Sequence, residues 1–90
     1  MSNEANEYRG YSLFNDVEDK ELRNYNRGQV MANIALSNQK GDSVSAVAAN
    51  DLFNYFNLID ASEREEVLAN FRKRMEEEGY AVELQAKTVH

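Results

Sequence analysis

Apolar residues recur at helical spacing in three stretches of the chain, separated by short polar segments. The middle stretch carries one apolar helical face, made up of Val44, Val47, Ala48, Leu52, Tyr55, Phe56 and Ile59. The last stretch carries a similar face, made up of Val67, Leu68, Phe71 and Met75. A looser stripe in the first stretch is made up of Val17, Leu22, Tyr25, Val30 and Ile34. The pattern predicts helices over 16–38, 44–59 and 62–78, and therefore an all-α fold.

Residues that commonly cap helices mark the expected boundaries. Asn15 or its neighbour Asp16 can accept hydrogen bonds from the free amides of the first helix. Gly41 is a plausible end for that helix. Residues 62–65 form an S-x-x-E capping box ahead of the third helix, and Gly79 follows that helix as its expected cap.

One glycine interrupts the first predicted helix. Gly28 lies in the helix interior, where glycine costs about 1 kcal/mol relative to alanine. Its presence predicts either a kink or the close approach of another chain or a ligand.

A short aromatic segment precedes the first helix. Residues 8–14, here called the arm, place three aromatic rings and a leucine around a glycine. The arm is too short for a stable helix and too apolar to remain in water, so it is expected to dock on something. Residues 1–7 are polar, have no apolar period and are expected to be a flexible tail.

The chain of 90 residues is expected to form one domain, 1–90, with a thin core. There is no cysteine, so disulfides and thiolate zinc sites cannot add stability. Association of several copies would bury more apolar surface, which favours a homo-oligomer. No segment reaches the roughly 18 to 20 apolar residues of a membrane span, and the polar N-terminus is not typical of a secretion signal, so a cytoplasmic location is expected.

The charge balance argues against one class of partner. A formal net charge of −6 and a pI near 4.7 do not suit a protein that binds duplex nucleic acid through a broad basic surface. Locally, however, Lys20, Arg23 and Arg27 outnumber the single acid Glu21. A small anionic ligand therefore remains compatible with this sequence.

The side chains needed for common catalytic mechanisms are largely missing. The single histidine, His90, is the last residue, and without cysteine the Ser–His and Cys–His arrangements are not available. The acidic run 76–78 cannot converge on one metal ion, because consecutive helical residues point in different directions. No glycine-rich phosphate loop is present. We expect a protein that is not an enzyme and that uses no cofactor or metal.

The arm and the first half of the first helix combine the groups that a nucleotide site needs. Tyr8 and Tyr11 offer flat faces for stacking on bases, and Arg23 and Arg27 offer donors for phosphates. Gly28 would allow a ligand to approach the backbone closely. The alternative is that the aromatic rings only clamp the arm onto the bundle or onto a neighbouring subunit.

Arg64 stands near the expected N-terminus of the third helix, among glutamates. It can form ion pairs with these neighbours. A helix N-terminus together with an arginine can equally bind phosphate.

Several runs of the sequence are distinctive together. They are Glu7-Tyr8-Arg9-Gly10-Tyr11-Ser12-Leu13-Phe14-Asn15-Asp16-Val17-Glu18-Asp19-Lys20, Leu22-Arg23-Asn24-Tyr25-Asn26-Arg27, Ala32-Asn33-Ile34, Asn54-Tyr55-Phe56 and Glu63-Arg64. Over about residues 7–80 the chain resembles a family of small phage proteins, the anti-CBASS sponges, which sequester the cyclic oligonucleotide signals of bacterial antiviral immunity.

This resemblance implies a helical homohexamer in the cytoplasm of the host bacterium. Such a protein binds cyclic dinucleotides such as cyclic GMP–AMP in pockets shared between protomers, binds cyclic trinucleotides at a separate site, and cleaves neither. The stacking tyrosine of the family matches Tyr11, and the family's phosphate-binding lysine falls at Asn26, with Arg27 as the nearest cation. The second site would involve Gly28 and Arg64.

The predicted ligand-binding residues are therefore Tyr8, Tyr11, Ser12, Arg23, Tyr25, Asn26, Arg27, Gly28 and Arg64. The predicted function is the capture of cyclic oligonucleotides, which would block activation of the immune effectors. The rival hypothesis is a small acidic protein–protein inhibitor or structural adaptor that acts on a host factor through its negative surface.

Overall fold

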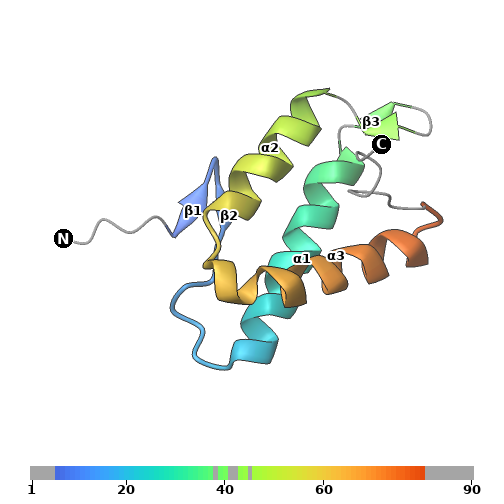
Figure 1. The fold of residues 1–90 in the computed structure, drawn as a ribbon. Coiled ribbons are helices and arrows are strands. Elements are labelled where there is room, and N and C mark those ends of the chain that lie inside the picture. Colours follow the sequence, from blue (N-terminus) through green and yellow to red (C-terminus); the bar gives the residue numbers. More distant parts are fainter. Residues whose placement is uncertain (1–5, 38, 41–42, 45, 81–90) are drawn as a thin grey trace.

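The computed structural model describes residues 6–37, 39–40, 43–44 and 46–80 (Figure 1). Most of this part of the chain is helical, as the sequence pattern predicts. The helical elements are α1 (Lys20–Ser37), α2 (Ala46–Asn57), the single 3-10 turn η1 (Ala61–Glu63) and α3 (Arg64–Glu77). Helix α1 contacts both of the others, and α3 crosses it near its middle (Figure 1).

Two short antiparallel hairpins, which the sequence pattern did not predict, accompany the helices. The first joins β1 (Glu7–Tyr8) to β2 (Tyr11–Ser12), and the second joins β3 (Gln39–Lys40) to β4 (Ser43–Val44). The second hairpin lies between α1 and α2. Because β4 occupies Ser43–Val44, α2 begins at Ala46, and the predicted start at residue 44 is wrong.

Helix α1 begins four residues later than predicted, because a different side chain caps it. The carboxylate of Asp19 accepts hydrogen bonds from the amides of Glu21 at 3.1 Å and Leu22 at 3.4 Å. The expected cap Asn15 instead accepts a hydrogen bond from Arg27 through its side-chain oxygen. Asp19, immediately ahead of the first helical turn, is therefore the N-cap.

The predicted capping box of α3 is also wrong. The hydroxyl of Ser62 donates to the Asp60 carboxylate at 2.9 Å, and Glu63 occupies the N-cap position without a capping side-chain hydrogen bond. Residues 61–63 form the 3-10 turn η1, so the regular helix starts at Arg64 rather than at residue 62.

The predicted C-terminal cap of α3 is confirmed. Gly79 has a φ of +94°, the left-handed conformation that glycine adopts without a Cβ penalty. The amide of Gly79 donates to the carbonyl of Glu76 at 3.0 Å, and the amide of Tyr80 donates to that of Met75 at 2.9 Å. This pair of bonds is the Schellman arrangement. The other predicted cap, Gly41, lies outside the described residues.

The core is made by one face of each helix together with one residue of the arm. Its buried apolar members are Leu13, Met31, Ala32, Ile34, Ala35, Ala48, Tyr55, Ile59, Val67, Phe71 and Met75. The predicted stripe of α3 is confirmed, with Leu68 half-buried at its edge. Three residues predicted to face inward are exposed instead: Leu22 by 49%, Tyr25 by 51% and Val47 by 63%. In α1, Asn24 and Arg27 take the inward positions of the first turns.

Gly28 marks a close approach within the chain itself. A Cβ atom at this position would lie 2.6 Å from the Asn70 Cβ and 3.0 Å from the Phe71 nitrogen, both on α3. The expectation of another chain or a ligand at Gly28 is therefore wrong, because α3 of the same chain occupies the space.

The arm folds back on itself and docks on the bundle. Arg9 and Gly10, at the centre of the turn, both have positive φ, at 53° and 90°, as in the type I′ turns that join two-residue hairpins. Glu7 pairs with Ser12, so the predicted flexible tail does not extend to this residue, and residues 1–5 lie outside the described part. Leu13 is fully buried. Among the described residues, no helix combines the length and apolar character needed to cross a membrane.

Candidate ligand-binding site

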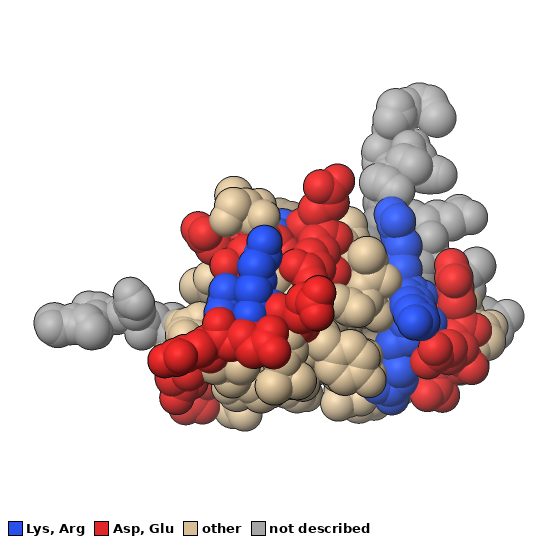
Figure 2. Space-filling view, turned by 90° about the horizontal axis from the view of Figure 1, so that it is seen from below, with Lys and Arg blue, Asp and Glu red and all other residues tan. Residues whose placement is uncertain are grey.

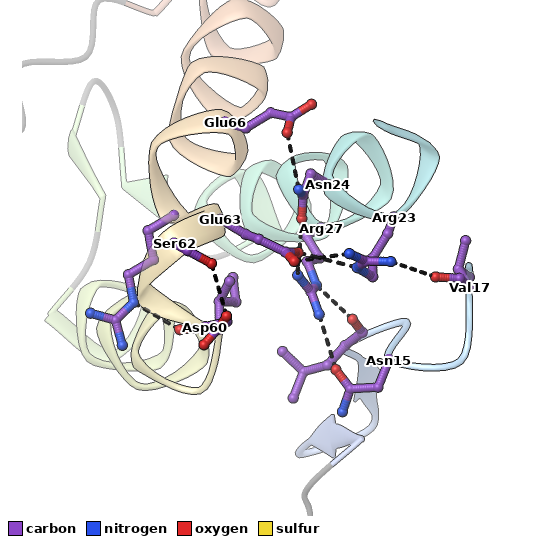
Figure 3. A network of polar contacts seen from close by, with 12 residues as sticks. Asn15, Val17, Arg23, Asn24, Arg27, Asp60, Ser62, Glu63 and Glu66 are labelled. Atoms are coloured by element: carbon purple, nitrogen blue, oxygen red, sulfur yellow. Dashed lines mark hydrogen bonds and ion pairs between the residues drawn. The ribbon is translucent and has the colours of Figure 1, made fainter. Parts of the chain in front are cut away.

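Arg27 lies at the centre of a polar network where the arm, α1 and the start of α3 meet (Figure 3). Its Nε donates to the Leu13 carbonyl at 2.7 Å, its Nη1 to the Asn24 Oδ1 and the Glu63 Oε1, both at 2.9 Å, and its Nη2 to the Asn15 Oδ1 at 3.0 Å. The residue is only 4% exposed. Every guanidinium nitrogen therefore has an acceptor inside the chain, and the predicted phosphate donor is engaged within the protomer.

Arg23 and Glu63 complete the network. The Nε and Nη2 atoms of Arg23 donate to the two carboxylate oxygens of Glu63 at 3.1 and 2.9 Å, and its Nη1 donates to the Val17 carbonyl at 2.7 Å. The hydrogen bond from Arg23 lowers the pKa of Glu63, against an opposing effect of burial, and the same bond raises the pKa of Arg23. Arg23 and Glu63 are therefore both charged at neutral pH, and Arg23 and Arg27 share the one Glu63 carboxylate.

The hydroxyl of Tyr8 fixes the tip of the arm to α2. It donates to the Asp51 carboxylate at 3.0 Å and accepts a hydrogen bond from the Asn54 amide at 3.1 Å. Arg9 lies 3.7 Å from the same carboxylate. The rings of Tyr8 and Tyr11 are half-buried and pack against the core. Part of each ring is thus used for docking, and part faces outward.

A second tyrosine holds the other strand of the hairpin. The buried hydroxyl of Tyr55 donates to the Ser12 carbonyl at 2.7 Å, and burial raises the pKa of this hydroxyl. The arm is therefore attached to α2 through Tyr8 and Tyr55 and to α1 through Arg27. In this structure it clamps onto the bundle of its own chain, which was the alternative to a ligand-binding role.

Arg64 is used at the junction of α2 and α3. Its Nε donates to the Ile59 carbonyl at 2.8 Å and its Nη2 to the Asn57 carbonyl at 3.1 Å. Asn57 is the last residue of α2, where a cation is favourable, and Ile59 lies two residues beyond it. The guanidinium also lies 5.5 Å from the centre of the Phe56 ring. Arg64 thus joins two helices rather than pairing with the glutamates that follow it.

The nine predicted site residues do not converge within one chain. The structure attaches the arm to α1 through the bond from Arg27 to the Leu13 carbonyl, whereas Tyr8 bonds to α2. Two helical residues turn through about 200°, so Tyr25 projects from the side of α1 opposite Arg27. The remaining members lie apart, with Asn26 half-buried on α1, Gly28 beneath α3 and Arg64 beside α2.

Sequence reasoning missed the acceptors that make the Arg27 network possible. Asn15 was expected to cap the first helix and Glu63 to lie in the capping box of the third, while Asn24 was given no role. The only local signal was the helical spacing of Asn24 and Arg27. It also missed Arg9, whose side chain is 66% exposed at the hairpin turn. Gly10 between two tyrosines was the available signal for that turn, although Arg9 is not a residue that such turns favour.

The surface around this network carries both signs of charge. In the view of Figure 2 the basic side chains form narrow stripes bordered by acidic ones. That face therefore lacks the broad basic surface of a duplex-binding protein. Among the described residues, no three acidic, histidine or cysteine side chains are grouped so that they could hold a metal ion.

Comparisons with known proteins identify no relative. No protein-family model matches the chain, and no curated protein or solved structure matches it. A function for the chain is therefore inferred from the geometry described above and from the resemblance of the sequence runs.

Proposed function

We propose that this chain is a phage immune-evasion protein that captures cyclic oligonucleotide second messengers without cleaving them. Acting in the host cytoplasm, it would keep these messengers from the effectors of bacterial antiviral immunity. The observation that best supports the proposal is the hairpin, which pairs Tyr8 with Tyr11, both half-buried, beside the exposed Arg9 of the turn. Aromatic faces beside cations are the groups that recognise bases and phosphates.

The structure changes how the arginines contribute to this proposal. Arg23 and Arg27 donate to internal acceptors, so direct phosphate contact falls to groups that remain accessible, with Tyr11, Ser12 and Asn26 half-buried and Arg9 exposed. Arg23 and Arg27 share the Glu63 carboxylate, and Asp19 and Glu66 also act on Arg23, so this network supplies no excess of positive charge. The accessible cation at the arm is Arg9, which would meet an anionic ligand there.

Uncovered apolar side chains support the homo-oligomeric part of the proposal. Leu22 and Tyr25 lie three residues apart on the outer side of α1, and Phe53 on α2 is 63% exposed. The outward face of α2 has no exposed charged side chain, because Asp51 is buried. We propose that these surfaces meet in an assembly, a hexamer by resemblance, and that a second copy completes each pocket. A trinucleotide site would then rest on Arg64, since Gly28 is covered.

Calorimetry with the full chain tests the proposal directly. Cyclic GMP–AMP and a cyclic trinucleotide are titrated into wild type, Tyr11→Ala and Tyr11→Phe. Loss of the stacking ring in Tyr11→Ala is expected to weaken dinucleotide binding by about tenfold or more, because base–aromatic stacking contributes about 1–3 kcal/mol. Tyr11→Phe keeps the ring and is expected to stay close to wild type.

Circular dichroism of each variant checks that helix content is unchanged. Native mass spectrometry reports the number of chains and of bound ligands together. Absence of any binding to wild type at micromolar concentration would overturn the proposed function.

A second candidate is favoured by the acidic surface of α3. Glu65, Glu76 and Glu77 are exposed in a chain with net charge −6. Such a surface suits an inhibitor that engages a basic host protein. A pull-down after removal of all nucleotides tests this function. Capture of one host protein by the wild type, and loss of that capture in the charge-reversed variants Glu76→Lys and Glu77→Lys, would favour it over nucleotide binding.

A further inference from the structure

Glu63 is connected to the arm through a single intermediate side chain. Its carboxylate accepts from Arg27, and Arg27 in turn donates to the Leu13 carbonyl and the Asn15 Oδ1. Glu63 belongs to η1, Arg27 to α1, and Leu13 and Asn15 to the segment that follows β2. Three parts of the chain that are far apart in sequence thus meet through one guanidinium (Figure 3).

The charge of Glu63 is what makes the buried position of Arg27 favourable. The other acceptors of Arg27 are the neutral oxygens of Leu13, Asn15 and Asn24. A buried guanidinium with only neutral acceptors is strongly disfavoured, and moving toward water relieves it. If the Arg27 side chain moved toward water, it would break its bonds to the Leu13 carbonyl and the Asn15 side chain, which hold the arm in place.

Backbone strain at Phe14 makes the arm sensitive to this change. Phe14 has a φ of +59°, a left-handed conformation that is costly for a bulky residue. It is maintained by local bonds, since the Phe14 amide donates to the Ser12 hydroxyl at 2.9 Å and the Asn15 amide donates to the Asn6 side chain at 2.8 Å. Leu13, which Arg27 holds, is the residue immediately before this strained position. Release of Leu13 would allow Phe14 to relax and the arm to change direction.

We propose that Glu63 is a positioning residue that sets the place of the arm through Arg27, and with it the exposure of Tyr8 and Tyr11. Glu63 acts without touching a ligand. The consequence for ligand binding rests on the proposed function, whereas the consequence for the arm does not.

The test compares two variants that remove the same charge from the same region of the full chain. Glu63→Gln keeps the side-chain length, but its amide NH₂ would face a guanidinium. Glu65→Gln, two residues on, neutralises an exposed glutamate in the first turn of α3. Hydrogen exchange is followed for the amides of Leu13 and Phe14, with Ile34 and Phe71 as core references.

In Glu63→Gln the exchange of the arm amides is expected to rise at least about tenfold relative to Glu65→Gln, as expected for loss of a charge-assisted network. The core amides should change much less. Equal arm exchange in the two variants would overturn the inference. If arm exchange rises in Glu63→Gln but even the wild type binds no cyclic nucleotide, the inference about the arm stands and the proposed function is overturned. If the inference about the arm and the proposed function are both correct, Glu63→Gln also weakens binding of cyclic GMP–AMP, and Glu65→Gln does not.

An acid titration of wild type keeps the test independent of whether the variant folds. The Glu63 carboxylate is faced by Arg23, Arg27 and Asn24 from α1. Glu66 of α3 and Asp19 ahead of α1 act on Arg23. Because the pKa of Glu63 is lowered from the ordinary 4.5, its contribution is complete above that value and is lost as the pH falls through the lower folded pKa.

The readout is the NMR signal of the Arg27 Nε–H, which donates to the Leu13 carbonyl. This signal and the Leu13 amide are expected to shift together below pH 4.5, before the core amides do. If the core unfolds at the same pH at which the arm signals shift, the proposal is contradicted.

Discussion

In the first half of α1 the inward positions are occupied by Asn24 and Arg27, whereas in the second half they are occupied by Met31, Ile34 and Ala35. The first half also leaves its large apolar side chain Leu22 exposed. The second half follows the usual hydrophobic pattern of a helix in a bundle. One helix thus combines a directional, polar attachment for the arm with a non-directional apolar attachment for the bundle, and Gly28 lies where the two meet.

The apolar half is expected to dominate stability. Ile34→Ala removes a fully buried side chain and is expected to lower the free energy of unfolding by about 3 kcal/mol, since core cavities of this kind typically cost about 2–5 kcal/mol. Urea unfolding followed by circular dichroism measures the loss. A decrease of less than about 1 kcal/mol would show that the second half is not the main source of stability.

The junction is expected to give an intermediate effect. Gly28→Ala should lower the free energy of unfolding by about 2 kcal/mol, because overpacking against Asn70 and Phe71 outweighs the better helix propensity of alanine. The double variant Gly28→Ala/Asn70→Gly removes the nearer of the two contacts and tests the cause. The double variant is expected to lose less stability than the sum of the two single variants. If the two losses simply add, the close approach of α3 is not the cause of the Gly28→Ala effect.

The outer surface of the polar half is expected to give the smallest effect. Leu22→Ser should change the free energy of unfolding by no more than about 0.5 kcal/mol at low protein concentration, because the side chain is already half-exposed. If copies associate through this surface, the destabilisation should grow with protein concentration. Unfolding measured across a hundredfold range of concentration separates a free surface from a covered one.

The second half of α1 and the apolar face of α3 could be predicted from sequence because their inward residues are apolar and repeat at helical spacing, whereas the start of α3 could not. The cap at Gly79 followed from its conformational freedom alone. The first half of α1 could not be predicted in this way. Hydropathy assigns Leu22 and Tyr25 to the inside and Arg27 to the outside, and the acceptor that reverses this order is Glu63, which lies 36 residues from Arg27.

The candidate site shows the same division. Sequence reasoning placed the arm beside the first half of α1, and the structure has these two segments in contact. It could not foresee that Arg27 would donate to the backbone of the arm, or that Arg64 would be used by the carbonyls of α2, because both depend on tertiary geometry. The hairpin turn at Arg9-Gly10 was hard to foresee, since such turns favour Asn-Gly or Asp-Gly and only Gly10 fits that preference.

Two of the bonds that hold the arm end on its main chain, because Arg27 donates to the Leu13 carbonyl and Tyr55 to the Ser12 carbonyl. A main-chain acceptor is present whatever side chain the residue carries. Substitutions at position 12 therefore leave these two attachments in place, although they remove the bond from the Phe14 amide to the Ser12 hydroxyl. In evolutionary terms, the surface that the arm presents can change in part without loss of its attachment to α1 and α2.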